Sequence, residues 1–599
     1  MIATAVGLAL GRSDEKARGP AGIIQVGGRS PSDLLRAAST PVLAVDPENE
    51  DRLVLANRIE RPRFSCSVFA SSDGGRTWRP SRFELPPVGE RCYAPQVAFA
   101  RAGRAYLLAT TLEGRGNEPF GGFLYQSLDG GATFGRPRQV LPRYAFQTAL
   151  AAMPDGALAV SFLSGSEFSR HATFGLGPPP NPVALTVSRD RGRSFSATRW
   201  VSARARELVG GPVLAIGSQG QVHVLYWDYL DDVFDHYSFP GRYGGRFQLV
   251  LAVSRDGGRS FEESVVDRAV VPGGPFLSYL PPLPALAIDR ETGALYAAWE
   301  DARTGSSDVL FRRSTDGGRT WSPARLLIAG PADERTPALA VSADGRLVAA
   351  AYRLVRGGGA DVVVRASDDG GRTFSEAATL TRTPFDTRIA PTMANHAERV
   401  DLGSKIALVR AGEEVLAAWA DTRHGTRDTG KVDILLTRVP GALPPAHALR
   451  PAPNPPPARA SRIDRRLRGG CSSGPRYDSR GSSLAVVRSF LSALERGELQ
   501  RAYGYLDARW RKGKAPVRRP HSFAEFSASF RALTCARLAL AESYDRSADG
   551  EWNTFRVWVA ARRGSGSARA LFGLFWTHSD TSRAPWSLMG YWTRELPAR

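Results

Sequence analysis

The chain has 599 residues, of which 42% are hydrophobic and 23% charged, and this composition is that of a folded protein rather than a disordered one. This length exceeds what one core usually fills, so we expect two or more domains. The formal net charge of +20 would suit an anionic partner, but the arginines are scattered and no nucleic-acid motif is present. Nucleic acid is therefore not expected as a partner. A membrane span is not expected either, because no apolar run reaches about 18 residues.

Four cysteines fall into two local pairs, Cys66 with Cys92 and Cys471 with Cys535, and no Cys or His cluster has the spacing of zinc ligands. We therefore expect no metal and no cofactor, and we interpret the pairs as disulfide candidates. The N-terminal segment 1–21 contains a short apolar run without a basic region before it, which could be the remnant of a secretion signal. Together these features favour a secreted or cell-envelope-associated protein.

One octapeptide of the pattern S-x-D-x-G-x-[T/S]-[W/F] occurs six times, and successive copies are separated by 53 to 66 residues. This period suits four-stranded propeller blades. In such a turn the carboxylate accepts backbone N–H groups, the glycine adopts positive φ, and the aromatic ring packs back onto the turn. These roles are structural, so the motif predicts a fold and no reaction. The carboxylates belong to Asp73, Asp129, Asp190, Asp256, Asp316 and Asp369.

An apolar hairpin precedes each copy, for example TPVLAVDPENEDRLVLAN at 40–57, as expected for the inner strands of a blade. A seventh unit, 403–439, has three predicted strands and no octapeptide. Its fourth strand must come from elsewhere, and GIIQV at 22–26 is the obvious donor, because this exchange closes the ring and removes an exposed sheet edge. The sequence therefore predicts an all-β, seven-bladed propeller over 22–441.

A Pro-, Ala- and Arg-rich stretch, 442–480, follows the predicted propeller and is typical of a solvated linker. Over 481–599 the pattern changes to two predicted helices, the second at 499–510, and then to four strand-like runs. This order indicates a small α+β domain and resembles the cone-shaped nuclear-transport-factor-2-like fold, without a diagnostic motif.

The octapeptide is the signature of the Asp-box, or bacterial neuraminidase, repeat, and residues 22–441 resemble this sialidase-like superfamily throughout. The resemblance implies a propeller whose boxes lie on the rim opposite the functional face. Sialidases hold the substrate carboxylate with three arginines and use a Tyr nucleophile, a Glu that activates it and an acid/base Asp. Their first arginine stands in an Arg-Ile-Pro motif that opens the first blade, where this chain has Ser39-Thr40-Pro41. The comparison therefore implies a scaffold without an intact sialidase site, and catalytic residues are not assigned.

Several other residues are candidates for the functional face. Arg335-Thr336-Pro337, at the start of the sixth blade, is the nearest substitute for the missing motif. Two matching segments, WEDAR at 299–303 and WADTR at 419–423, either form structural Asp–Arg pairs under a packed Trp or present an arginine to an anionic ligand. The ligand-binding candidates are Arg58, Asp228, Tyr229, Asp301, Arg303, Arg335, Asp421 and Arg423.

An aromatic and acidic insertion at 226–245 either suits sugar stacking with hydroxyl recognition or packs only its own side chains. Three hypotheses about function remain open. The one we favour is an exported binding protein whose central face takes a glycan or an extracellular protein partner. The second is an exo-α-sialidase-type glycoside hydrolase with a rearranged arginine cluster, and the third is a purely structural envelope protein.

Overall fold

The computed structural model describes most of the chain. The described residues are 22–26, 35–61, 64–89, 91–114, 118–165, 181–206, 208–230, 247–273, 283–355, 357–393, 396–455, 476–511, 522–530, 533–546, 552–563, 569–579 and 587–595. The predicted segment 1–21, Cys471 and most of the insertion at 226–245 lie outside these ranges. No helix among the described residues is long and apolar enough to span a membrane.

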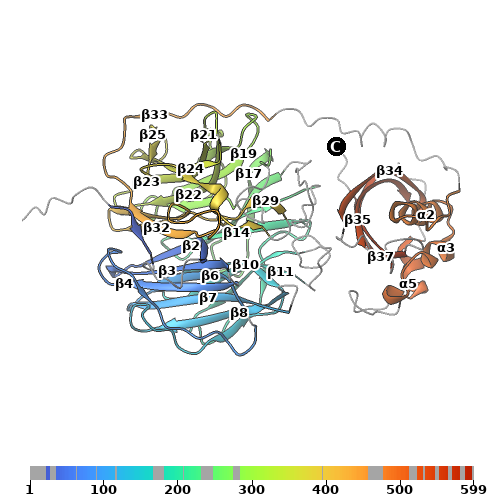
Figure 1. Ribbon diagram of the computed structural model, residues 1–599, viewed down its shortest axis with the longest axis horizontal. Helices are drawn as coiled ribbons and strands as arrows, with labels where there is room; N and C mark the ends of the chain where they lie inside the picture. Colours follow the sequence, from blue (N-terminus) through green and yellow to red (C-terminus); the bar gives the residue numbers. More distant parts are fainter. Residues whose placement is uncertain are drawn as a thin grey trace, which may run out of the picture.

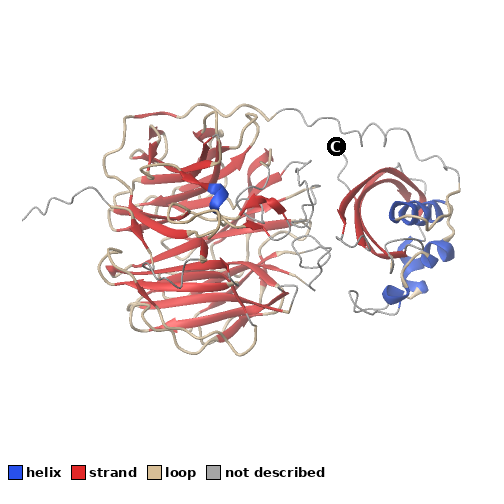
Figure 2. Ribbon diagram, viewed as in Figure 1, coloured by secondary structure: helices blue, strands red, loops and turns tan. Residues whose placement is uncertain are grey.

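The first part of the chain is a seven-bladed β-propeller, as predicted (Figures 1 and 2). Within each of the first six blades, antiparallel strands follow one another in chain order from the inner to the outer strand. The first three blades contain β2 (Ala37–Asp46), β3 (Asn49–Arg61), β4 (Ser65–Ser71) and β5 (Arg79–Pro80), then β6 (Arg91–Ala100), β7 (Arg104–Glu113), β8 (Glu118–Ser127) and β9 (Arg138–Leu141), then β10 (Ala145–Ala152), β11 (Leu158–Ser164), β12 (Val183–Ser188) and β13 (Arg199–Trp200).

The next three blades repeat this arrangement, and the sixth has an additional short strand, β27 (Phe385–Asp386), paired with its third strand. Core clusters of apolar side chains lie between neighbouring sheets. Blades four to six contain β14 (Val209–Ile216), β15 (Val222–Asp228), β16 (Phe247–Ser254) and β17 (Glu262–Val270), then β18 (Ala285–Ile288), β19 (Leu295–Asp301), β20 (Asp308–Ser314) and β21 (Arg325–Ile328), then β22 (Asp333–Val341), β23 (Leu347–Val355), β24 (Gly359–Ser367) and β26 (Ala378–Thr379).

The seventh blade closes the ring with a strand from the N-terminal end of the propeller. Its own strands are β30 (Ala407–Ala411), β31 (Glu414–Asp421) and β32 (Asp433–Arg438), and β1 (Ile24–Gln25) pairs antiparallel with β32. The amide of Val26 also donates to the Ile434 carbonyl at 2.9 Å. The donor strand predicted at 22–26 is thus confirmed, and it covers the edge that β32 would otherwise expose.

All six octapeptides form the same turn between the third and fourth strands of a blade. In the copy at 367–374, the Asp369 carboxylate accepts from the amide and the hydroxyl of Thr373, at 2.9 and 2.7 Å, and from the hydroxyl of Ser367 at 2.8 Å. The Ser367 hydroxyl in turn accepts from the amide of Gly371, which has a φ of +79°. The polar groups of the turn therefore find their hydrogen-bond partners within the octapeptide, and the positive φ favours glycine at this position.

The chain after the seventh blade returns along the outside of the propeller (Figure 1). The short strand β33 (Ala446–Ala448) pairs with β25 (Thr373–Ser375), and Leu449 is buried in the core shared by blades five and six. The Leu326 amide then donates to the Arg450 carbonyl at 3.0 Å. The beginning of the stretch predicted as a solvated linker therefore packs on the propeller, because its apolar residues meet the exposed edges of the two outer strands.

The C-terminal part combines helices with a four-stranded antiparallel sheet (Figure 2). The helices precede the strands along the chain, as predicted. The second predicted helix, 499–510, is split, because Asp507 donates its amide to the carbonyl of Leu588 and the Leu588 amide donates to Tyr505, both at 2.8 Å. Phe490 and Phe526 pack in the core of this part, with ring centroids 6.2 Å apart. Its elements are α2 (Ser483–Glu495), α3 (Leu499–Gly504), α4 (Ala508–Arg511), α5 (Phe523–Phe530), β34 (Leu533–Arg546), β35 (Trp552–Arg563), β36 (Arg569–His578) and β37 (Ser587–Glu595).

One disulfide joins Cys66 of β4 to Cys92 of β6, with Cα atoms 5.4 Å apart. It connects the first two blades, as the sequence predicted. The other predicted partners stay a prediction, because Cys471 lies outside the described residues and Cys535 is described only as part of β34.

Candidate functional site

The strand register defines two ends of each blade. In the first blade, Leu53 in the first half of β3 pairs with Ser71, where the repeated turn begins. Arg58, near the other end of β3, pairs with Ser39 of the inner strand. The repeated turns therefore lie at one end of the blades, and the starts of the inner strands lie at the opposite end, which we call the central face.

A bulge recurs in the inner strands at the central face. The register between inner and second strand shifts at this point in blades one, two, three, four and six. Each shift coincides with a residue whose backbone has a positive φ, which is unusual for residues other than glycine. The residues with positive φ are Thr40, Ala94, Gln147, Gly211 and Thr336. The repetition in five blades indicates a built feature that sets the direction of the neighbouring side chains at this face.

Arg58 lies at the centre of a buried ionic cluster that joins three blades. Its guanidinium contacts the Glu60 carboxylate on the same strand, donates to the Tyr93 hydroxyl at 2.8 Å and donates to Asp401 at 3.2 Å. Arg58 is 3% exposed, and the Ser39 hydroxyl donates to Glu60 at 2.6 Å. Burial lowers the pKa of Arg58, but Glu60, Tyr93 and Asp401 more than offset it, so the pKa rises overall. This arginine is fully neutralised and is not available to a ligand.

Asp401, the acidic partner from the connection before blade seven, also has a raised pKa, but for a carboxyl group this rise favours the neutral form. Burial and the nearby Glu60 carboxylate raise the pKa of Asp401, while Arg58 and the amide of Gly403, 2.8 Å from its other oxygen, work against this shift. The buried carboxylates of Glu60 and Asp401 therefore share the single guanidinium of Arg58.

Lys405 lies beside this cluster and differs from Arg58 in its partners. Its ammonium donates to Oε1 of Gln96 at 3.1 Å, and it forms no ion pair with any of the residues the structure describes. Lys405 is only partly buried by its surroundings, yet desolvation lowers its pKa to about 8. At neutral pH this group is still mostly a cation, and a neutral amide is its neighbour rather than a carboxylate.

Arg335, the substitute considered for the missing motif, is also neutralised. Its guanidinium lies 3.4 Å from Glu300 and 3.2 Å from Asp333. The other Glu300 oxygen accepts from the backbone amide of Thr336 at the bulge. Burial raises the pKa of Glu300, and Arg335 opposes this effect. The Arg-Thr-Pro segment thus anchors blade six to blade five.

The WEDAR segment forms a structural ion pair. Arg303 donates to Asp301 at 2.6 Å and to Asp267 of blade four at 3.3 Å, and its side chain is 4% exposed. The indole N–H of Trp299 points at the same Asp301 carboxylate, at 3.4 Å. This contact connects the second strand of blade five with the outer strand of blade four.

The WADTR segment repeats this geometry in blade seven. Asp421 is fully buried and accepts from the indole N–H of Trp419 at 3.0 Å and from Arg423 at 2.8 Å. The side chain of Arg423 is 22% exposed, more than that of Arg303. Both segments therefore match the structural interpretation, an Asp–Arg pair under a packed Trp.

The two candidates at the start of the insertion are core residues of blade four. Asp228 accepts from Arg206 and from the amide of Leu230, the latter at 3.0 Å. Tyr229 is 1% exposed and packs edge-on against Phe247, with ring centroids 4.8 Å apart. Neither presents its side chain to solvent.

A further pair of perturbed carboxylates lies between blades five and six. Burial raises the pKa of Glu334 to about 7 and also raises that of Asp308. Glu334 is completely buried and accepts from Arg353 at 2.9 Å. Because both carboxylates are closed off from solvent, this pair joins blades and is not accessible to a glycosidic bond.

The structure does not bring the candidate arginines together. Each is bound by carboxylates of its own, and in the described part of the chain no acid contacts two of them. The residues that do meet at the central face are Arg58, Glu60, Tyr93, Gln96, Asp401 and Lys405, of which only Arg58 was a candidate. Ala94-Pro95 shares with three of the other bulges a proline directly after the residue at positive φ, and this pattern could have identified the neighbouring Tyr93. Asp401 and Lys405 carry no repeated signal.

No group of three or more His, Cys, Asp or Glu side chains is placed to hold a metal ion within the described ranges. No family model and no curated protein matches the chain.

Solved structures resemble the chain only at the level of the fold. A protein of unknown function from Dyadobacter fermentans shares 15% identity, covering 57% of this chain and 96% of that one, with a TM-score of 0.39. A Hadza microbial sialidase shares 19%, covering 57% and 66%, with a TM-score of 0.37. An ulvan lyase from a polysaccharide lyase family shares 12%, covering 67% and 93%, with a TM-score of 0.43. At these values none of them bears on the function, which has to follow from the residues themselves.

Proposed function

We propose that this protein is an exported binding protein whose central propeller face takes an acidic group of a glycan, without sialidase catalysis. The observation that carries this proposal is the pair of Lys405 and Gln96, 3.1 Å apart at the central face. The Lys405 ammonium supplies the charge that a carboxylate needs. Gln96 holds the ammonium in place, because its Oε1 accepts from Lys405 while its Nε2 donates to the Pro95 carbonyl at 2.9 Å.

The electrostatic contrast with the neighbouring cations supports this assignment. Arg58 and Arg335 are each held by two carboxylates, so their charges are compensated inside the protein. Lys405 has no such counter-charge among the described residues, and its desolvated surroundings strengthen attraction to an incoming anion. An anionic ligand would supply the missing partner.

The separated arginines argue against the sialidase alternative. A hydrolase of that type needs three guanidinium groups that converge on one carboxylate, and Arg58, Arg303 and Arg335 are buried in different ion pairs. Freeing any of them would leave buried carboxylates unpaired, which costs several kcal/mol.

Three broader assignments belong to the same proposal. The six identical turns support membership of the Asp-box, sialidase-like superfamily, because each uses the Ser, Asp, Gly and Thr or Ser positions of that signature. The disulfide between Cys66 and Cys92 supports export to an oxidising compartment. The helices followed by a four-stranded sheet support a nuclear-transport-factor-2-like C-terminal domain.

A glycan array probed with the full chain tests the central proposal, with Lys405→Met as the site variant and Arg136→Gln, an exposed arginine, as the charge-matched control. We expect acidic glycans to be retained by the wild type and the control and lost in Lys405→Met. If the wild type hydrolyses a fluorogenic sialoside and a folded Arg335→Ala variant does not, the binding proposal is refuted and the sialidase-type hydrolase is supported. If the chain binds proteins but no glycan, the proposed glycan ligand is wrong and the ligand is a protein.

A further inference from the structure

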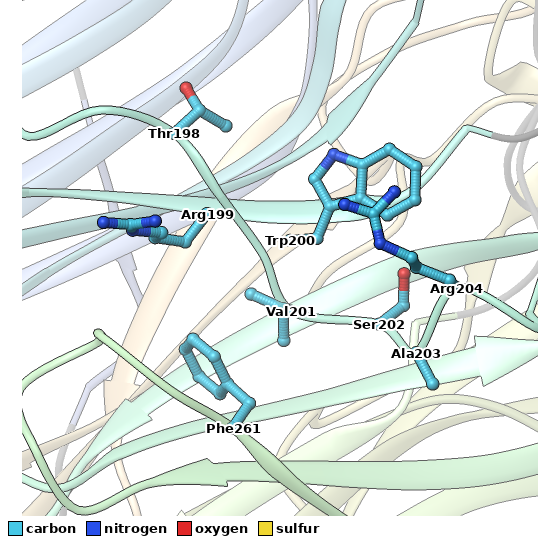
Figure 3. A pocket seen from close by; sticks show the side chains of 8 residues that line it. All are labelled: Thr198, Arg199, Trp200, Val201, Ser202, Ala203, Arg204 and Phe261. Carbon is cyan, nitrogen blue, oxygen red and sulfur yellow. The ribbon is translucent and has the colours of Figure 1, made fainter.

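A second candidate site lies away from the central face, at the outer edges of blades three and four. A cavity of about 490 Å³ is lined by residues 198–204, which include β13, and by Phe261, the closing aromatic residue of the repeated turn in blade four (Figure 3). This volume is within the range of small-ligand sites.

The backbone that forms this cavity is held from both blades. The amide of Val201 donates to the Val183 carbonyl of blade three at 2.8 Å, and the amide of Ala203 donates to Glu263 of blade four at 2.7 Å. The Ser202 hydroxyl accepts from the Val183 amide at 3.2 Å. These bonds fix the backbone of residues 201–203 between the two blades.

Trp200 and Arg204 form an exposed stacked pair in the cavity (Figure 3). Trp200 is 40% exposed, although it is among the largest apolar side chains. The guanidinium carbon of Arg204 lies 4.5 Å from the centre of its indole ring. Stacking occupies the face of the guanidinium and leaves its N–H edge free to bind an oxyanion in bidentate fashion.

The charges around the cavity are unbalanced. Arg199 and Arg204 both line it, and neither forms an ion pair with any described residue. The nearest acid that the backbone contacts, Glu263, is already bound by Arg206, by the Tyr226 hydroxyl and by the Ala203 amide. The cavity therefore presents the guanidinium of Arg204 beside an exposed indole, and that of Arg199 on its other side (Figure 3).

We propose that this cavity is a second binding site, for an acidic oligosaccharide. The N–H edge of Arg204 binds the carboxylate or sulfate group, and the part of the Trp200 indole that Arg204 leaves uncovered packs against the apolar face of a sugar ring. Arg199 points away from this pair and adds positive charge on the other side of the pocket (Figure 3). The site is independent of the central face, since it shares no residue with the surroundings of Lys405.

Isothermal titration calorimetry with the full chain tests this site. The probes are an oligogalacturonate hexasaccharide, whose only acidic groups are carboxylates, and a galacto-oligosaccharide whose only acidic groups are sulfates. The comparison probes are neutral maltohexaose and a hexaglutamate peptide. The variants are Trp200→Ala, Arg204→Gln and the control Arg136→Gln, and the unfolding transition of each shows that it is folded. We expect affinity for one or both acidic saccharides to fall about tenfold in the two site variants and to stay unchanged in the control.

The pattern across the probes decides the outcome. Binding of the uronate alone identifies a carboxylate ligand, and binding of the sulfated saccharide alone identifies a sulfate ligand; both support the site. Equal affinity for maltohexaose, equal binding of hexaglutamate, or no binding at about 10 mM of either acidic saccharide overturns it. A loss in Lys405→Met but not in Trp200→Ala would also overturn it and would assign the ligand to the central face.

Discussion

Lys405 of the connection into blade seven donates its ammonium proton to Gln96 of blade two at 3.1 Å, across 309 residues of sequence. The contact exists because the ring closes and places the inner strands of blades seven and two, β30 and β6, on either side of β2 in blade one. It gives the central face a cation that no carboxylate among the described residues compensates, and it is the contact on which the proposed function depends.

The pH dependence of stability should reveal Lys405. Its pKa of about 8 in the folded protein lies below its usual value of 10.5, so between these pH values the unfolded chain binds more protons and stability rises with pH. Lys405→Met removes this rise. We expect the unfolding free energy of the wild type, measured relative to Lys405→Met, to increase from pH 7 to pH 10.

A variant of Gln96 tests why the pKa of Lys405 is lowered. Gln96→Glu places a carboxylate beside the ammonium and should raise the pKa of Lys405, which moves the rise in stability to higher pH. A difference between the wild type and Lys405→Met that stays constant with pH would contradict the assignment.

Arg58→Met should destabilise the propeller by about 3–5 kcal/mol, because it leaves the buried Glu60 and Asp401 carboxylates without their shared cation. Urea unfolding measures the loss. Adding Asp401→Asn to Arg58→Met should restore part of it, since one of the two uncompensated charges is then removed. A loss below about 1 kcal/mol, as expected for the exposed Arg136→Met, would mean that the cluster is hydrated rather than buried.

Asp369→Ala should cost about 1–3 kcal/mol, because the amide and hydroxyl of Thr373 and the hydroxyl of Ser367 lose their acceptor. These bonds lower the pKa of Asp369 although its partial burial opposes the shift. The stabilisation is therefore complete above the usual value of 3.8 and is lost as the pH falls through the lower pKa of the folded state. The advantage of the wild type over Asp369→Asn should accordingly shrink below about pH 4; an advantage that grows there would contradict the hydrogen-bond account.

Removal of residues 1–34 should lower the unfolding temperature and promote self-association, because β32 then exposes the backbone that β1 covers. Removal of residues 1–21 alone leaves β1 in place and is the matched control. Calorimetry and size-exclusion chromatography report the two effects. Identical behaviour of both truncations would show that β1 contributes nothing to closure.

Replacement of Cys66 and Cys92 by alanine should cost about 2–4 kcal/mol, since the disulfide joins residues 26 positions apart in the unfolded chain. Reductant should lower the stability of the wild type by a similar amount and leave the double variant unchanged. Sensitivity of the double variant to reductant would point instead to the second cysteine pair.

The sequence alone determined the propeller, its seven blades and the strand that closes it. The hydrogen bonds of each repeated turn lie within one octapeptide, as between Asp369 and Thr373, so a local pattern reports them directly. The absence of an octapeptide in the seventh unit then left β1 as the natural fourth strand. The disulfide between Cys66 and Cys92 could also be predicted, because the two cysteines are only 26 residues apart and the repeat places them on neighbouring blades.

Only the tertiary structure decided what the charged residues do. The contact of Arg58 with Asp401 spans 343 residues, and no repeat marks Asp401 or Lys405, so the central cluster has no local signature. The pairing of β33 with β25 likewise depends on apolar residues that meet only after the ring has closed. Local bonding within the turns specifies the blades, whereas ring closure selects which charges are compensated and leaves Lys405 beside an amide rather than a carboxylate.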